Sequence, residues 1–145
     1  MQSDEIPFTA NPIDYTQASH DLHNQGFDDY ALKSFRQGIK NWPENSIVLM
    51  ALGNAEYSSG NYVDAIAAFK RELKLRVRNE NAWNNLAYAL AAKNCKTKAI
   101  KAISCANELS PDDANIQQSL LELQRMSATN DGACEAFRCP VNLND

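Results

Sequence analysis

The sequence predicts an all-α fold, a right-handed superhelix (an α-solenoid) of three helix-turn-helix repeats followed by a capping helix and a cysteine-containing tail. The first observation is an apolar motif that recurs every 34 residues, at positions 31–35, 65–69 and 99–103. Each copy begins with Ala, continues with Leu or Ile and ends with Phe or Ile. The second observation is that turn residues share this interval, because Gly26, Gly60 and Asn94 are equally spaced. A period of about 34 residues with this punctuation is typical of helical repeat arrays.

Size and composition limit the classes of function. The 145 residues suffice for one domain with an adequate core, and 44% hydrophobic with 22% charged residues is ordinary for a globular protein. The net charge of −4 argues against a general nucleic-acid binder, which needs a basic excess. No apolar run approaches the ~18 residues of a membrane-spanning helix, and residues 1–7 lack the features of a signal peptide. We therefore expect no nucleic-acid partner and no membrane insertion.

The repeat domain is predicted to span residues 13–126, between an extended leader (1–12) and a C-terminal tail (127–145). Repeats are expected at about 12–45, 46–79 and 80–113, with helix pairs at 46–58 and 62–75 and at 81–93 and 97–109. The first pair is expected to end at Asn24 and Asn41, and its apolar side chains are Tyr15, Ala18, Leu22, Tyr30, Ala31, Phe35 and Ile39. A last helix, about 114–126, has no repeating partner, so we predict that it caps the apolar face of the third repeat.

The repeats resemble the tetratricopeptide family, whose pattern is W-x2-L-G-x2-Y, then A-x3-F, then P. The second copy contains Leu49-x2-Leu52-Gly53 and Ala65-x3-Phe69. The third contains Trp83-x2-Leu86-Ala87, Ala99-x3-Ile103 and Pro111. The first copy diverges in its first helix but keeps Ala31-x3-Phe35 and Pro43. The resemblance covers about residues 12–111, and it implies a non-catalytic scaffold with a concave groove for a protein or an extended peptide.

The resemblance also implies which side chains face the groove, because the first helix of each pair lines it in tetratricopeptide folds. By register, the predicted binding residues are Gln17, His20, Asn54, Tyr57, Asn81, Asn84, Asn85, Tyr88, Gln118 and Glu122. The same register places on this face Ile13, Thr16, His23, Ile47, Met50 and Arg125. Asparagine both donates and accepts hydrogen bonds, so this set suits the backbone of an extended peptide. The alternative is that the asparagines only solvate a helix face and that the array is a spacer or packs on another domain.

Some tetratricopeptide relatives hold a partner's terminal carboxylates in a clamp of Lys, Arg and Asn. The matching positions here carry no Lys or Arg, so we do not expect such a clamp; they are Thr16, His20, Ala51, Asn81 and Asn85. His20 and His23 have a spacing that suits a metal, but no third ligand converges on them, so we predict neither a metal site nor a cofactor. A basic cluster on the second helices is expected to be a solvated outer face; it comprises Lys70, Arg71, Lys74, Arg76 and Arg78.

The four cysteines predict two disulfides. Cys95 and Cys105 should bracket one helix, about 15 Å apart by helical rise. The five steps from Cys134 to Cys139 span about 16 Å if extended. A tail that runs back along the last repeat helix would meet Cys95 first, so we predict the pairs Cys95–Cys134 and Cys105–Cys139. Disulfides favour an extracytoplasmic compartment, periplasmic or secreted. The alternative is four reduced thiols in a cytoplasmic protein.

No nucleophile elbow, phosphate loop or metalloprotease helix occurs in the sequence, so the chain itself is not expected to be an enzyme. Residues 82–87, together with Cys95, Cys105 and the pair Cys139-Pro140, are also similar to repeat segments that follow a papain-like cysteine peptidase domain in some exported bacterial proteins. That resemblance implies a C-terminal module of a peptidase whose catalytic residues lie upstream, outside this chain. A further alternative is self-association through the open edge of the first repeat, unless the leader covers it with Ile6, Pro7, Phe8 and Ile13.

Overall fold

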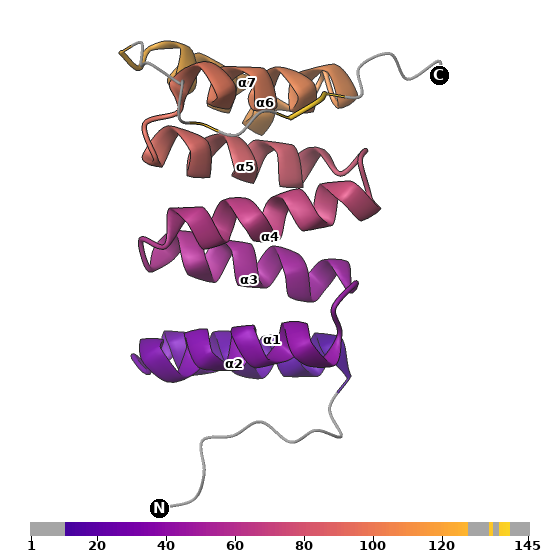
Figure 1. Cartoon of the computed structure of the whole chain (residues 1–145), viewed down its shortest axis with the longest axis vertical. Helices are drawn as coiled ribbons and strands as arrows, with labels where there is room; N and C mark the ends of the chain where they lie inside the picture. Colours follow the sequence, from indigo (N-terminus) through magenta and orange to yellow (C-terminus); the bar gives the residue numbers. More distant parts are fainter. Residues whose placement is uncertain (1–10, 128–133, 135–136, 140–145) are drawn as a thin grey trace, which may run out of the picture.

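The computed structural model describes residues 11–127, 134 and 137–139, and in this part of the chain it contains seven helices and no strand. The helices stack in chain order along the long axis of the molecule (Figure 1). They are α1 (Pro12–Asn24), α2 (Asp28–Asn41), α3 (Ser46–Ser58), α4 (Tyr62–Leu75), α5 (Glu80–Ala92), α6 (Lys96–Leu109) and α7 (Ala114–Gln124). The predicted all-α array of three helix pairs and a cap is confirmed. Residues 1–10 of the predicted leader and most of the predicted tail lie outside the described residues.

Each repeat begins at a side-chain cap that obeys the same interval of 34. The side-chain oxygens of Asn11, Asn45, Asn79 and Asp113 accept hydrogen bonds from backbone N–H groups in the first turns of α1, α3, α5 and α7. Such caps satisfy N–H groups that have no partner within the helix. The turn inside each repeat also has a fixed geometry, because Gly26, Gly60 and Asn94 adopt φ of 87°, 79° and 62°. Glycine and asparagine tolerate this left-handed conformation better than other residues, which explains why they recur there.

The repeated apolar motif forms the core between helices. Ala65 and Ala99 are fully buried, and Phe69 packs where Gly53 of α3 leaves room. A Cβ at position 53 would lie 2.7 Å from Phe69 Cζ, so only glycine allows this approach. One apolar cluster runs from α4 to α7, whereas Ala31 and Phe35 of α2 form a smaller cluster with α3. The first repeat therefore joins the stack through less apolar packing than the others. No helix in the described part of the chain has the length and apolarity needed to cross a membrane.

Tyr30, counted among the apolar side chains of the first helix pair, does not belong to the core. It is 45% exposed, and its ring packs against Phe27 with ring centroids 6.4 Å apart. Its register equivalents in the next repeats are Asp64, which is exposed, and Lys98, which is half-buried. Both equivalents are charged, so the interval of 34 gave no support for a core residue at this position.

Two buried glutamates, which sequence patterning did not single out, bind the repeats together through polar contacts. Glu56 of α3 is 3% exposed and accepts from Arg36 Nε at 2.6 Å and from Asn61 Nδ2 at 2.9 Å. Glu72 of α4 is fully buried and accepts from Ser46 Oγ at 2.6 Å and from Arg76 Nε at 2.8 Å. These carboxylates connect α2 to α3 and α4 to α3. Buried charges are tolerated when they are paired and hydrogen-bonded in this way.

The Glu72 site has further partners. Asn79 Nδ2 donates to Glu72 Oε1 at 3.0 Å, and Arg76 Nη2 also donates to the carbonyl oxygen of Glu44. Burial by itself would raise the pKa of Glu72, but the hydrogen bonds from Arg76, Ser46 and Asn79 together lower it below the ordinary value. Arg76, expected to be part of a solvated basic face, instead stabilises a carboxylate inside the stack.

Candidate binding groove

The curvature of the stack defines its concave face. The first helices of successive repeats approach each other within 8 Å between Cα atoms, from α1 to α3, α3 to α5 and α5 to α7. Among the described residues, the second helices make no such approach from α2 to α4 or from α4 to α6. Helices on the inside of a curved stack are the closer set, so α1, α3, α5 and α7 line the concave face. We call this face the groove.

Two separate hydrogen bonds link polar side chains on three helices of the groove, and we call these side chains the polar band. Asn85 Nδ2 of α5 donates to Asn54 Oδ1 of α3 at 2.9 Å. Tyr88 Oη of α5 donates to Glu122 Oε2 of α7 at 2.5 Å. His20, Asn54, Tyr88 and Glu122 are spaced by 34 residues, so they form one column along the stack. The structure therefore brings predicted groove residues from α3, α5 and α7 into one connected surface.

Two further predicted residues extend the polar band. Asn84 Nδ2 donates to Asn85 Oδ1 at 3.3 Å, and Gln118 Nε2 donates to Glu122 Oε1 at 3.1 Å. Of the ten predicted groove residues, Asn84, Asn85 and Tyr88 are half-buried, and the exposed ones are Gln17, His20, Asn54, Tyr57, Asn81, Gln118 and Glu122. Gln17 bonds to Asp21 on its own helix, and Tyr57 packs on Tyr62, so these two lie apart from the band.

Two details of the band concern its chemistry. Asn84 Oδ1 is buried and accepts no hydrogen bond from the described residues. A buried acceptor without a donor is uncommon in native proteins, so this oxygen marks a place where the groove is polar and unsatisfied.

Burial raises the pKa of Tyr88, and its hydrogen bond to Glu122 raises it further. The same bond lowers the pKa of Glu122, with a smaller contribution from Gln118.

The expectation that Thr16 faces the groove is wrong. Thr16 is 6% exposed, although its neighbours Gln17 and Ile13 are exposed. Its register equivalents, Met50 and Asn84, are only half-buried, so Thr16 is the one copy of this position that is buried. The Thr16 side chain is shorter than that of Met50, so neighbouring side chains cover it.

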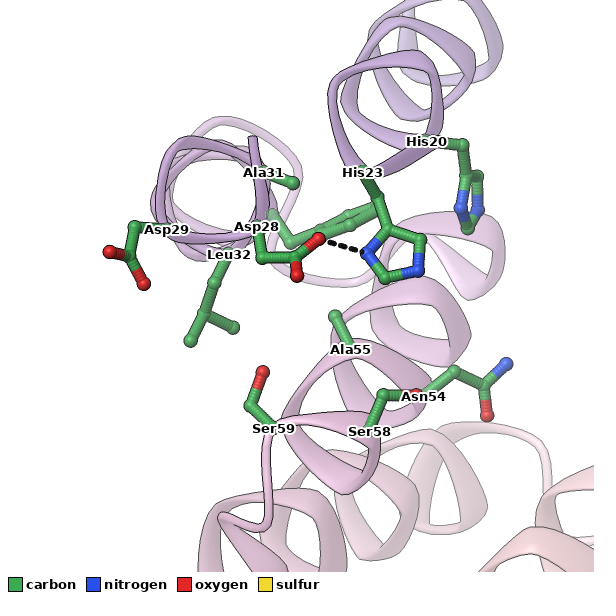
Figure 2. A pocket seen from close by; sticks show the side chains of 11 residues that line it. His20, His23, Asp28, Asp29, Ala31, Leu32, Asn54, Ala55, Ser58 and Ser59 are labelled. Carbon is green, nitrogen blue, oxygen red and sulfur yellow. Dashed lines mark ion pairs between the residues drawn. The ribbon is translucent and has the colours of Figure 1, made fainter. Parts of the chain in front are cut away.

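A cleft of about 450 Å³, hereafter the first-interface pocket, opens between α1, α2 and α3 (Figure 2). Phe35, Ala31, Leu32 and Ala55 give it apolar walls, and its polar lining comprises His20, His23, Asp28, Asp29, Asn54, Ser58 and Ser59. His23 Nδ1 lies 2.8 Å from Asp28 Oδ1, and this pair is drawn as the dashed line in Figure 2. The His20 ring meets Phe35 edge-on, with centroids 5.0 Å apart. Sequence patterning identified the two histidines and Asn54 but not the two aspartates.

The histidines do not form a cation site with neighbouring carboxylates and thiols. In the described part of the chain, no group of three or more His, Cys, Asp or Glu side chains is arranged to hold a metal ion. His20 lies on Phe35 and His23 pairs with Asp28, so each ring makes a different contact.

The tail approaches α6 with the cysteine pairs in the predicted order. Cys95 faces Cys134 with a Cα–Cα separation of 6.0 Å, and Cys105 faces Cys139 at 5.8 Å, both within the range of a disulfide. Phe137, which the sequence did not single out, packs on Trp83 with ring centroids 5.7 Å apart. Lys101 Nζ donates to the carbonyl oxygen of Phe137 at 3.0 Å. The described tail residues thus lie against α5 and α6, on the repeat farthest from the first-interface pocket.

Comparison with known proteins agrees with this architecture. Residues 15–76 match a family model described as tetratricopeptide repeat. The chain is 31% identical over 85 residues to superkiller protein 3 of Schizosaccharomyces pombe, and 32% identical over 92 residues to the TPR repeat-containing thioredoxin TTL4 of Arabidopsis thaliana. These matches cover 59% and 61% of this chain but only 6% and 14% of the two relatives.

Solved structures share the fold at low sequence identity. The first TPR of Spaghetti (RPAP3), bound to the HSP90 peptide SRMEEVD, superposes with a TM-score of 0.71 at 17% identity, over 79% of this chain and 90% of that one. The second TPR domain of human RPAP3, in complex with the HSP70 peptide SGPTIEEVD, gives 0.71 at 14% identity, over 80% and 100%. MamA from Desulfovibrio magneticus RS-1 gives 0.69 at 20% identity, over 79% and 64%. The match over residues 15–76, the repeat arrangement of the described helices and this shared fold show that the chain has a tetratricopeptide-repeat fold of three helix pairs and a capping helix.

Proposed function

We propose that this chain is a non-catalytic scaffold that binds an extended segment of another protein in its groove. The observation that carries the proposal is the polar band, in which Asn85 bonds to Asn54 between α5 and α3, and Tyr88 bonds to Glu122 between α5 and α7. Amide side chains offer a donor and an acceptor each, which matches the alternating N–H and C=O groups of an extended backbone. Two of the structural neighbours hold peptides, which supports this use of the fold.

The chemistry of the groove argues for a different class of peptide from those in the RPAP3 complexes. Both of those peptides end in Glu-Glu-Val-Asp and are acidic at that end. Here the positions expected for a carboxylate clamp carry no Lys or Arg, and the band itself contains the carboxylate Glu122. Like charges repel across a partly desolvated surface. We therefore expect neutral or basic segments to bind in preference to acidic ones.

The test is selection of a random-peptide display library on the purified chain, followed by affinity measurement for the enriched sequences. The double variant Asn84→Ala, Asn85→Ala removes two members of the band and should weaken binding by about thirtyfold, since hydrogen bonds to neutral groups contribute about 1 kcal/mol each. The melting temperature should stay near the wild-type value, because both side chains are only half-buried.

The matched control is Asn115→Ala with Gln124→Ala, two exposed polar side chains on α7 for which no role in the band is expected. Their substitution should leave peptide affinity unchanged. A library that yields no enriched peptide, or enriched peptides that bind both double variants equally, would contradict the proposal.

The second candidate is that the array is the C-terminal module of an exported papain-like cysteine peptidase. The approach of Cys95 to Cys134 and of Cys105 to Cys139 favours it, because paired cysteines suit an oxidising compartment. The groove would then position a substrate or partner for a domain upstream. The curated relatives are far longer than this chain, which is consistent with tetratricopeptide arrays serving as parts of larger proteins.

A further inference from the structure

The first-interface pocket is lined by polar side chains at positions where the next repeat carries aromatic ones. Residues 34 positions on from His23, Asp28 and Asn54 are Tyr57, Tyr62 and Tyr88. Tyr57 and Tyr62 pack on each other with ring centroids 5.6 Å apart, whereas the corresponding His23 and Asp28 form a polar pair. Three large aromatic side chains at one interface are thus replaced by three smaller polar ones at the other. The opening follows from particular residues, not from general looseness of the stack.

The pocket combines an apolar interior with an acidic rim. Phe35 is 5% exposed, and together with Leu32 and Ala55 it provides apolar surface below the polar rim. Asp28 and Asp29 begin α2 and stand at that rim, and Figure 2 shows the Asp28 carboxylate reaching toward His23. The described lining residues include no Lys or Arg. The two carboxylates of the pocket are those of Asp28, which pairs with His23, and Asp29.

This combination fits a side chain with an apolar stem and a cationic head. Lys and Arg place their methylene groups on apolar surface while the charged group stays near water and carboxylates. A guanidinium also stacks on aromatic rings and donates to several acceptors at once. The serine hydroxyls at positions 58 and 59 and the Asn54 amide supply such acceptors on the α3 side. An acidic side chain would meet Asp28 and Asp29 instead, and would be repelled.

We propose that the first-interface pocket is the specificity site of the groove and accepts an arginine or lysine side chain of the bound peptide. The inference rests on the proposed function, since Asn54 belongs both to the pocket and to the polar band. A peptide backbone on the band can therefore place one of its side chains between α1, α2 and α3. The pocket then decides which residue stands at that position, while the asparagines bind the backbone whatever its sequence.

The experiment compares two capped pentapeptides, Gly-Ser-Arg-Ser-Gly and the same peptide with citrulline in place of arginine. Citrulline keeps the length and shape of the side chain but is neutral. Each is titrated into isotopically labelled protein while backbone amide shifts are followed by NMR. We expect shifts at Asn81, Asn85 and Tyr88 with both peptides, and shifts at His23, Asp28 and Asn54 with the arginine peptide. The arginine peptide should bind up to about fivefold more tightly, the upper end of the range expected for an exposed charge pair.

Two variants sharpen the test. Asp28→Asn with Asp29→Asn removes the rim charge, and Asn54→Tyr fills the pocket with the residue found at the second interface. Both should abolish the difference between the two peptides, and the amide spectrum shows whether each variant is folded. The control, Glu108→Gln with Asp112→Asn, makes the same change in net charge at exposed positions far from the pocket and should keep the difference.

The two proposals fail in different ways. Equal affinity for both peptides, with shifts along the polar band, would contradict the proposed role of the pocket but not that of the groove. A difference in affinity that persists in the Asp28 and Asp29 variant would have the same meaning. Arginine-specific shifts at the pocket without any shift along the band support the pocket and contradict the groove. Absence of any shift with either peptide overturns the pocket directly, while the library selection decides separately whether the groove binds peptides.

Discussion

The guanidinium of Arg36 on α2 holds both carboxylate oxygens of Glu56 on α3, with Nε–Oε1 at 2.6 Å and Nη2–Oε2 at 3.1 Å. This pair crosses the boundary between the first and second repeats, where Ala31 and Phe35 form a smaller apolar cluster than the one that runs from α4 to α7. Glu56 is 3% exposed, while the Arg36 side chain remains about half exposed at 51%. The buried charge of Glu56 is therefore stabilised by Arg36 and Asn61, and we expect the Arg36–Glu56 pair to stabilise the contact between the first two repeats.

Removal of the arginine should loosen the first repeat. Arg36→Met leaves the Glu56 carboxylate buried with only Asn61 to bond, which costs about 1–3 kcal/mol for a charged group that loses a partner. Urea denaturation measures the loss, and hydrogen exchange should show faster exchange in α1 and α2 than in α5 and α6. Lys33→Met, an exposed change on the same helix, is the control. Equal stability of the two variants would show that the pair contributes nothing.

Gly53→Ala should destabilise the stack despite the better helix propensity of alanine. The added Cβ would lie 2.7 Å from Phe69 Cζ, so the aromatic ring or the helix must move, and overpacking of this kind costs about 1–3 kcal/mol. Gly38→Ala is the matched helical control, because its Cβ would lie 3.1 Å from Tyr15 Cε1 and 3.4 Å from Val48 Cγ1. That change should stay within about 1 kcal/mol of the wild type. Thermal melts of the two variants compare them directly, and the same loss in both would refute the role assigned to the Gly53–Phe69 contact.

Stability should fall in acid partly through Glu72. Its pKa is lower in the folded chain than its ordinary value of 4.5, so folding favours the charged form. The resulting stabilisation is fully present above the unfolded-state pKa and is lost as the pH falls through the folded-state value. Glu72→Gln should therefore reduce stability at neutral pH, because Arg76 and Ser46 lose a charged acceptor, and should flatten the acid side of the pH profile. Urea midpoints from neutral pH to about pH 3 test this, with Glu108→Gln as the exposed control; an acid limb that keeps its slope in Glu72→Gln would contradict the assignment.

The cysteine pairs make a prediction about the redox state of the protein. We expect no alkylatable thiol in denatured, unreduced protein that was produced in an oxidising compartment, and tryptic peptides that join Cys95 to Cys134 and Cys105 to Cys139. The loops closed by these bonds span 39 and 34 residues, so replacing one pair by serine should cost about 2–4 kcal/mol. Mass spectrometry counts the labelled thiols. Four labelled cysteines would contradict the pairing and would favour a protein of a reducing compartment.

The interval of 34 determined most of what could be known from the sequence. It located all the described helices to within a few residues and identified the helix-pair turns at Gly26, Gly60 and Asn94, because each repeat buries the same positions and turns with the same backbone geometry. The same register placed Asn54, Asn85 and Tyr88 on one face. The four helix-capping residues from Asn11 to Asp113 are also spaced by 34 residues, but sequence analysis did not identify them.

Departures from the repeat were decided only by tertiary structure. Glu56 and Glu72 have the apolar or small equivalents Leu90 and Ala106 in the third repeat, so periodicity gave no reason to expect buried carboxylates there. Their burial depends on partners such as Arg36, 20 residues away in sequence and on another helix. The first-interface pocket has the same origin, because it forms only where the smaller side chains of one repeat face those of the next. A repeat pattern specifies what every copy shares, whereas a site depends on where copies differ and on which differences come into contact.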